Sequence, residues 1–107
     1  MTDILDKPVV EEREFLTFLM EEEEYGVDIL SVQEIRKWEK VKPIPNAPPY
    51  IKGVINLRGD IVPIVDLRVR FHFEGVEYTP TTVVIILRGE SHGQEIKTGI
   101  VVDAVSD

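Results

Sequence analysis

Short apolar segments joined in pairs by turn residues are the feature that most limits how this chain can fold. GVINL (53–57) and IVPIVDL (61–67) are separated by Arg58, Gly59 and Asp60, a tight hairpin pattern in which glycine supplies a positive φ. TVVIIL (82–87) and TGIVVDAV (98–105) are separated by the polar stretch 88–97, which predicts another hairpin. About six such strands at hairpin spacing predict an all-β, barrel-like fold, since small antiparallel folds remove their edges by closing.

A further hairpin is predicted near the N-terminus. Residues 15–20 are apolar on both faces of a strand, and Tyr25, Val27 and Ile29 resume a period of two after four glutamates. Glu21 to Glu24 therefore form the predicted turn, and we interpret this charge run as a solvated surface.

Helical spacing appears once between the strands. Asp28 is predicted to cap a short helix through DILSVQEIRKW (28–38), because Ile29, Val32 and Ile35 recur on one face. Gln33, Glu34 and Arg36 would then face outward.

Prolines mark two other features. KPIPNAPPY (42–50) holds four of the seven prolines and is expected to be an irregular, extended connector. Pro63 cannot donate to a ladder, so its strand is expected to be an edge or bulged strand. DLRVRF (66–71) is predicted to form one helical turn.

Charge argues against some partner classes. The chain of 107 residues has 12 basic and 20 acidic residues, 12 − 20 = −8, and residues 1–24 alone carry 2 − 9 = −7. A nucleic-acid backbone would repel such a domain. Residues 1–13 are expected to be a flexible acidic tail. No signal-peptide pattern occurs and no apolar run approaches the roughly 20 residues that span a bilayer, which predicts a cytoplasmic protein without direct membrane insertion.

Catalytic and cofactor motifs are missing from the sequence. His72 and His92 stand in no recognisable motif and are interpreted as surface or loop histidines. No metal-ligand spacing or phosphate-binding glycine loop occurs, so no cofactor is predicted. One enzymatic alternative stays open, in which Asp60 and Asp66 converge in a deep pocket as an acid/base pair.

Several ordered strings carry a family resemblance. The chain from Phe15 to Asp107 resembles the CheW coupling proteins of bacterial chemotaxis through EEYGVDILSVQEI (23–35), IPNAPPYIKGVINLRGDIVPIVDLR (44–68), TVVIIL (82–87) and GIVVDAVSD (99–107). The resemblance implies a non-catalytic adaptor that joins methyl-accepting chemoreceptors to the histidine kinase CheA. It also implies two SH3-like five-stranded barrels, with the receptor tip docked in a groove between them.

The resemblance also implies receptor-binding residues. Matched residue by residue, they are Val32 and Glu34 in SVQEI, Arg58 in NLRG and Val105 in VVDAV. Arg58 lies at a predicted hairpin turn, where its planar guanidinium could bond acceptors on a partner helix. Two other interpretations stay open: Arg58 as a solvated turn residue, and Val32 as a core residue.

Relatives of this kind continue beyond VVDAVSD with strands that complete the second barrel. We therefore expect a CheW-like domain over 14–107, with a complete first barrel at about 15–76 and a partial second barrel at about 77–107. Unpaired strands would expose backbone groups, so we expect self-association through Thr82 to Val105. A functional alternative is a CheW-like module of a larger CheA-type kinase or of a receiver-fused coupling protein.

Overall fold

The computed structural model describes residues 13–106, and within them the fold is all-β, as predicted. Residues 1–12 of the predicted acidic tail lie outside the described residues. The strands, with one short helix and one 3₁₀ turn, are β2 (Phe15–Met20), β3 (Glu23–Asp28), η1 (Ile29–Ser31), β4 (Val32–Lys37), β5 (Ile51–Leu57), β6 (Asp60–Asp66), α1 (Leu67–Arg70), β7 (Val83–Ser91), β8 (Gln94–Val102) and β9 (Ala104–Val105).

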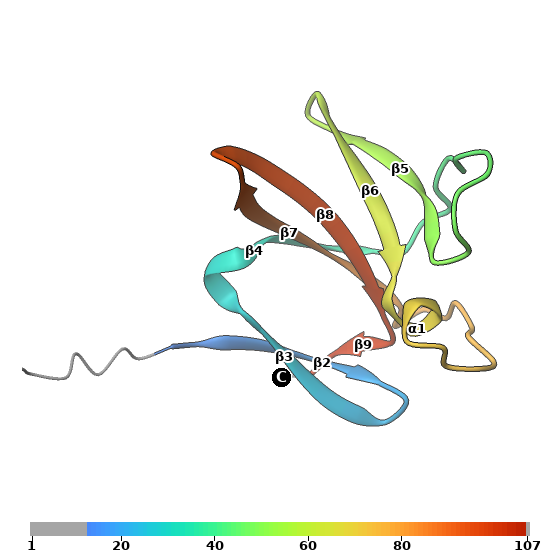
Figure 1. Ribbon diagram of the computed structural model, residues 1–107. Helices are drawn as coiled ribbons and strands as arrows, with labels where there is room; N and C mark the ends of the chain where they lie inside the picture. The colour runs from blue at the N-terminus through green and yellow to red at the C-terminus, as the bar shows by residue number, and fades with distance from the viewer. Residues whose placement is uncertain (1–12, 107) are drawn as a thin grey trace, which may run out of the picture.

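The strands form two packed sheets. The larger has the order β4-β7-β8-β6-β5, and the smaller has the order β3-β2-β9 and lies below it in Figure 1. All pairings are antiparallel except β6 with β8, which is parallel over Ile64–Asp66 and Gly99–Val101. Each sheet contains strands from before and from after the expected boundary at residues 76 and 77. The division into two barrels therefore stays a prediction.

Each sheet remains open in its strand pairing, but the connector after β4 brings the ends of the larger sheet together. The Val54 N–H donates to the Lys42 carbonyl at 3.0 Å, an isolated bridge between the connector and β5. Gly53 permits this approach, because its φ is +152° and a Cβ there would lie 2.0 Å from the Lys42 oxygen. The predicted connector over 42–50 is irregular, as expected, but it contains turns at 45–46 and 49–50 and so is not extended throughout.

The two faces of β7 and β8 serve two cores. Ile85, Ile100 and Val102 face the smaller sheet and pack with Phe18 and Met20. The opposite face packs inside the larger sheet, where the buried residues are Leu57, Val62, Ile64, Val84, Ile86 and Val101. Burial on both faces explains why these two strands are continuous apolar runs rather than alternating ones.

Helical spacing at 28–38 predicted too much helix. Asp28 does cap a turn, with its Oδ1 accepting from the Leu30 N–H at 2.9 Å, but η1 ends at Ser31. Val32–Lys37 forms β4 instead, because pairing with the apolar β7 outweighs a weak local preference for helix. Ile35 is exposed, while Glu34 and its neighbour Gln33 are half-buried, which reverses the predicted faces.

Two predicted turns are shorter than expected, because the strands continue into them. The β2–β3 turn is Glu21 and Glu22 alone, and the β7–β8 turn is His92 and Gly93. All four have positive φ, as tight two-residue turns between twisted strands require. The polar stretch 88–97 is therefore mostly strand.

Pro63 lies in a strand that is an edge over only part of its length. β6 has β5 on one side throughout, and its pairing with β8 begins at Ile64. No residue of β8 is paired with Pro63, so the missing N–H of this proline breaks no hydrogen bond to β8. The strand as a whole is internal, and the prediction of an edge strand was therefore wrong for β6. The helical turn predicted at 66–71 is confirmed as α1.

The predicted unpaired edge at Thr82 to Val105 is wrong for the central part of this segment. Over Val83–Leu87, β7 lies between β4 and β8, and over Gly99–Val101, β8 lies between β7 and β6. Strands from earlier in the chain supply these neighbours. β9 is an edge of the smaller sheet, and the outer parts of β7 and β8 pair only with each other, so self-association stays a prediction for those parts.

Candidate functional site

Arg58 and Glu34 are brought together on the surface of the larger sheet. Arg58 Nη2 donates to Glu34 Oε1 at 2.8 Å, and the Arg58 side chain is 70% exposed. Arg36 Nε lies 3.9 Å from the other oxygen of Glu34. Two of the four residues matched to receptor contacts thus form one exposed charge cluster.

The β5–β6 turn holds Arg58 outward. Arg58 and Gly59 both have positive φ, 52° and 94°, and their flanking residues Leu57 and Asp60 are paired. The side chain of Asn56 caps the turn, with its Oδ1 accepting from the Gly59 N–H at 2.8 Å. This two-residue turn projects the Arg58 side chain away from the core, as predicted.

A β-bulge separates Val32 from Glu34. Val32 pairs with Leu87 and Glu34 with Ile86, so three residues of β4 oppose two of β7. The bulge turns Val32 toward the core between the sheets, where it packs with Leu87, and turns Glu34 to the other face. The open interpretation of Val32 as a core-packing residue is therefore supported.

Val105 lies on the smaller sheet. It is half-buried in β9, paired with Phe18 of β2, whose side chain belongs to the core between the sheets. The four matched residues are thus a surface charge pair, formed by Glu34 and Arg58, and two half-buried valines, of which Val32 packs on the core between the sheets.

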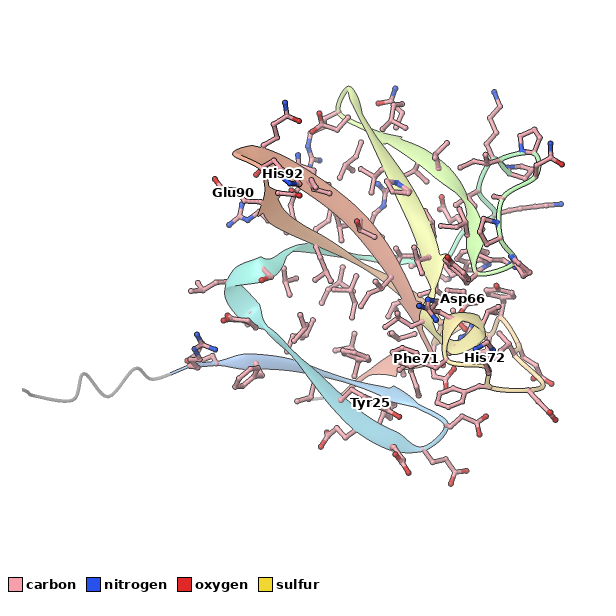
Figure 2. All side chains as sticks on the ribbon, viewed as in Figure 1. Tyr25, Asp66, Phe71, His72, Glu90 and His92 are labelled. Atoms are coloured by element: carbon pink, nitrogen blue, oxygen red, sulfur yellow. The ribbon has the colours of Figure 1, made fainter. Side chains whose placement is uncertain are left out.

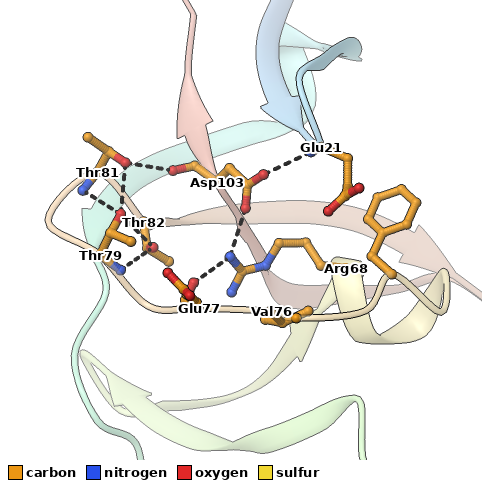
Figure 3. A pocket seen from close by; sticks show the side chains of 10 residues that line it. Glu21, Arg68, Val76, Glu77, Thr79, Thr81, Thr82 and Asp103 are labelled. Atoms are coloured by element: carbon orange, nitrogen blue, oxygen red, sulfur yellow. Dashed lines mark hydrogen bonds and ion pairs between the residues drawn. The ribbon is translucent and has the colours of Figure 1, made fainter.

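A buried polar network at the junction of the two sheets was not predicted. The Arg68 side chain, 4% exposed, donates from Nε and Nη2 to the two oxygens of Asp66, both at 2.9 Å. Its Nη1 donates to the Glu77 carbonyl and to Asp103 Oδ1, both at 2.8 Å (Figure 3). Arg68 therefore joins the end of β6 to the segment between β8 and β9.

Asp103 extends this network to the smaller sheet. Its Oδ2 accepts from the Glu21 N–H at 2.9 Å, and its own N–H donates to the Leu19 carbonyl at 3.0 Å. Its carbonyl accepts from the Thr81 hydroxyl at 3.1 Å. The available signal was DLR (66–68) directly after an apolar strand, because a carboxylate and an arginine so placed need partners when buried.

Burial and hydrogen bonding shift three pKa values in this network. Burial acts to raise the pKa of Asp66, but hydrogen bonds from Arg68 and Tyr78 and the Arg68 charge bring it below the usual value. Burial and the bond to Asp66 raise the pKa of the Tyr78 hydroxyl. Burial opposes the Arg68 charge, yet its two carboxylate partners raise the Arg68 pKa.

The enzymatic alternative fails on geometry. Asp60 and Asp66 lie at opposite ends of β6, which at roughly 3.3 Å per residue separates them by about 20 Å. Asp60 is exposed and bound to Lys97 at 2.6 Å, whereas Asp66 is fully buried and bound to Arg68 and Tyr78. The two carboxylates do not converge on a substrate.

The histidines lie apart on the surface, as predicted. Figure 2 shows His92 at the tip of the β7–β8 hairpin and His72 beside α1, and both are exposed. Within residues 13–106, no group of three or more His, Cys, Asp or Glu side chains could hold a metal ion. No helix over the same residues is long and apolar enough to cross a membrane.

Comparisons with known proteins identify the fold's family. The family model described as a CheW-like domain matches residues 14–107, and the chain belongs to this family. The chemotaxis protein CheW of Klebsiella aerogenes is 58% identical over 95 residues, covering 89% of this chain and 55% of that protein. The CheW of Rhizobium meliloti is 42% identical, covering 89% and 59%.

A solved structure supports the same assignment. The scaffolding protein TtCheW from Thermoanaerobacter tengcongensis superposes with a TM-score of 0.78 at 39% identity, covering 89% of this chain and 62% of that one. This chain spans a little more than half the length of the relatives that it matches. The similar proteins are thus chemotaxis proteins, one of them a scaffold.

Proposed function

We propose that this chain is a non-catalytic adaptor of bacterial chemotaxis that links the tips of methyl-accepting chemoreceptors to the histidine kinase CheA. The observation that carries the proposal is the family match over residues 14–107, together with a CheW relative that is 58% identical over 95 residues. In this role the protein works in the cytoplasm, is recruited to membrane-anchored receptor arrays, and uses no cofactor.

The proposed receptor-binding residues are Val32, Glu34, Arg58 and Val105. Arg58 is the strongest of them, because it is 70% exposed and, among residues 13–106, donates one hydrogen bond, to Glu34, of the five that a guanidinium can donate. A partner helix that offers a carboxylate or a carbonyl can bind the remaining donors without unfolding the turn. Glu34 is in turn available to a donor on the partner.

A charge reversal at the turn tests this site. Arg58→Glu removes the donors and places a second carboxylate beside Glu34, so binding to a soluble receptor-tip fragment is expected to weaken at least about tenfold. Arg88→Glu is the matched control, because Arg88 is also exposed and lies at another position of the larger sheet. Isothermal titration calorimetry measures both, and unchanged affinity of Arg58→Glu would remove Arg58 from the site.

The kinase side of the proposal is tested separately. Purified CheA is passed over immobilised receptor-tip fragments with and without this chain. The adaptor function predicts that CheA is retained only when the chain is present, and that retention falls with Arg58→Glu but not with Arg88→Glu. Retention of CheA without the chain, or its absence with the chain, contradicts the linking role.

A further inference from the structure

An apolar groove with a basic rim lies where the connector passes β5. It has a volume of about 410 Å³ and is lined by Trp38, Lys40, Val41, Pro43, Lys52 and Tyr78. None of the proposed receptor-binding residues lines it. The groove therefore lies outside the site already described.

The floor of the groove is a fixed aromatic pair. The rings of Trp38 and Tyr78 stack with centroids 4.5 Å apart and an interplanar angle of 20°. The Tyr78 hydroxyl donates to buried Asp66 at 2.7 Å, and the Trp38 backbone N–H donates to the Thr82 carbonyl at 3.1 Å. Because the stacking and the Tyr78 hydroxyl bond hold the two rings in place, an apolar side chain can pack against them without first ordering them.

The rim of the groove carries positive charge without local neutralisation. Lys52 Nζ lies 5.8 Å from the centre of the Tyr78 ring, and neither Lys52 nor Lys40 forms an ion pair with an acid among residues 13–106. Over residues 35–57 there are five cations and one acid, 5 − 1 = +4, in a chain whose net charge is −8. The groove is thus a locally basic site on an acidic protein.

Trp38 adds a further unused donor. Its indole N–H makes no hydrogen bond to any residue over 13–106. An indole nitrogen only donates, so a ligand in this groove is matched when it presents an acceptor. Two lysine ammonium groups and an indole N–H around an apolar floor together suit a carboxylate attached to an apolar group.

We propose that this groove binds an extended, acidic segment of a partner protein. One apolar side chain of the segment lies on the Trp38–Tyr78 pair, and a neighbouring carboxylate binds Lys40 and Lys52. Aromatic-lined grooves receive extended peptides, and a segment that is already extended loses little conformational freedom on binding. The interaction goes beyond the adaptor function proposed above, since it adds a binding site distinct from Arg58.

The fluorescence of Trp38 reports on the groove directly, because it is the single tryptophan of the chain. A short synthetic peptide that alternates glutamate with leucine is titrated into the protein, and a peptide that alternates lysine with leucine serves as its charge control. The acidic peptide is expected to change the Trp38 emission saturably, and the basic peptide is not. The absence of a saturable change, or equal binding of both peptides, would overturn the proposal.

Charge-reversal variants distinguish binding in the groove from nonspecific electrostatic attraction between the protein and the peptide. Lys52→Glu is expected to weaken the acidic peptide about tenfold. Lys37→Glu changes the net charge equally at an exposed position that does not line the groove, and is expected to alter affinity by less than about twofold. Lys40→Glu repeats the test should Lys52→Glu fail to fold.

An equal loss in Lys37→Glu would show that the attraction is nonspecific and overturn the groove as a site. Arg58→Glu is expected to leave peptide binding unchanged. Failure of this proposal is thereby distinguishable from failure of the receptor site.

Discussion

Two arginine–carboxylate clusters within residues 13–106 differ in burial. At the β5–β6 turn, Arg58 is 70% exposed and reaches one oxygen of Glu34. At the junction of the sheets, Arg68 is 4% exposed and holds both oxygens of Asp66 as well as Asp103. In water the first pair can exchange its partner at little cost, whereas the second cannot open without leaving a charge in the core.

This difference agrees with the separate roles proposed for the two arginines. The exposed cluster contributes little to stability, so the proposed contact with a partner could use Arg58 without loss of the fold. The buried cluster begins at the end of β6 and at α1, beside the larger sheet. Through Asp103 it reaches the β2–β3 turn of the smaller sheet (Figure 3). Since Val105 lies two residues after Asp103, this link also sets where β9 lies relative to the larger sheet.

Removing Arg68 is expected to have the largest effect. In Arg68→Met the carboxylate of Asp66 stays fully buried without its cation, which costs about 3–5 kcal/mol of the free energy of unfolding. Urea denaturation followed by circular dichroism measures the loss. The double variant Asp66→Asn with Arg68→Met removes both charges and is expected to recover part of it. A loss below about 1 kcal/mol in the single variant would contradict the assigned role.

Stability is expected to fall at both extremes of pH. The pKa of Asp66 is lowered in the folded state, so its contribution is present above the unfolded pKa of about 3.9 and is lost as the pH falls through the folded value. The pKa of Tyr78 is raised, so its contribution is present below about 10 and is lost as the pH rises through the folded value. Thermal melts across pH measure both losses, and Tyr78→Phe is expected to remove the alkaline one.

The link to the smaller sheet is expected to be weaker. Asp103→Asn keeps an oxygen that can accept from the Glu21 N–H but loses the charge that pairs with Arg68. The Asp103 side chain is 37% exposed, so the expected loss is about 1–2 kcal/mol. Hydrogen exchange at β2 and β9 should increase more than at β7 and β8. Equal increases in all four strands would show that Asp103 stabilises the fold as a whole rather than the junction.

The sequence predicted the hairpins well, because the residues that specify a turn lie within the turn itself or next to it. The Arg58–Gly59 turn, the α1 turn at 67–70 and the connector at 42–50 all formed where their glycines, caps and prolines indicated. β4 was missed because its apolar spacing also fits a helix, and only the pairing with β7 decides between the two. The bulge that turns Val32 away from Glu34 depends on the same pairing.

Long-range pairing could not be predicted from local patterns. Lys97 and Asp60, or Arg68 and Asp103, are separated by 37 and 35 positions, and no periodicity relates them. The parallel pairing of β6 with β8 also joins segments far apart in the sequence, so local patterns could not predict it. This pairing gives β8 a neighbour where the sequence alone suggested an unpaired edge. The candidate site residues were named through the family resemblance, and their arrangement as a surface charge pair and two half-buried valines required the structure.

The smallest expected effect is the coupling between Arg58 and Glu34. A double-mutant cycle with Arg58→Ala and Glu34→Ala should give a coupling energy of about 0.2–1 kcal/mol, which decreases as salt screens the exposed pair. The matching cycle for Arg68→Ala and Asp66→Ala should give a larger value that changes little with salt, because burial excludes the screening ions. Urea denaturation at low and high ionic strength measures both cycles. Equal coupling energies with equal sensitivity to salt would contradict the difference in burial between the two clusters. They would also remove the argument that Arg58 can leave Glu34 for a partner at little cost.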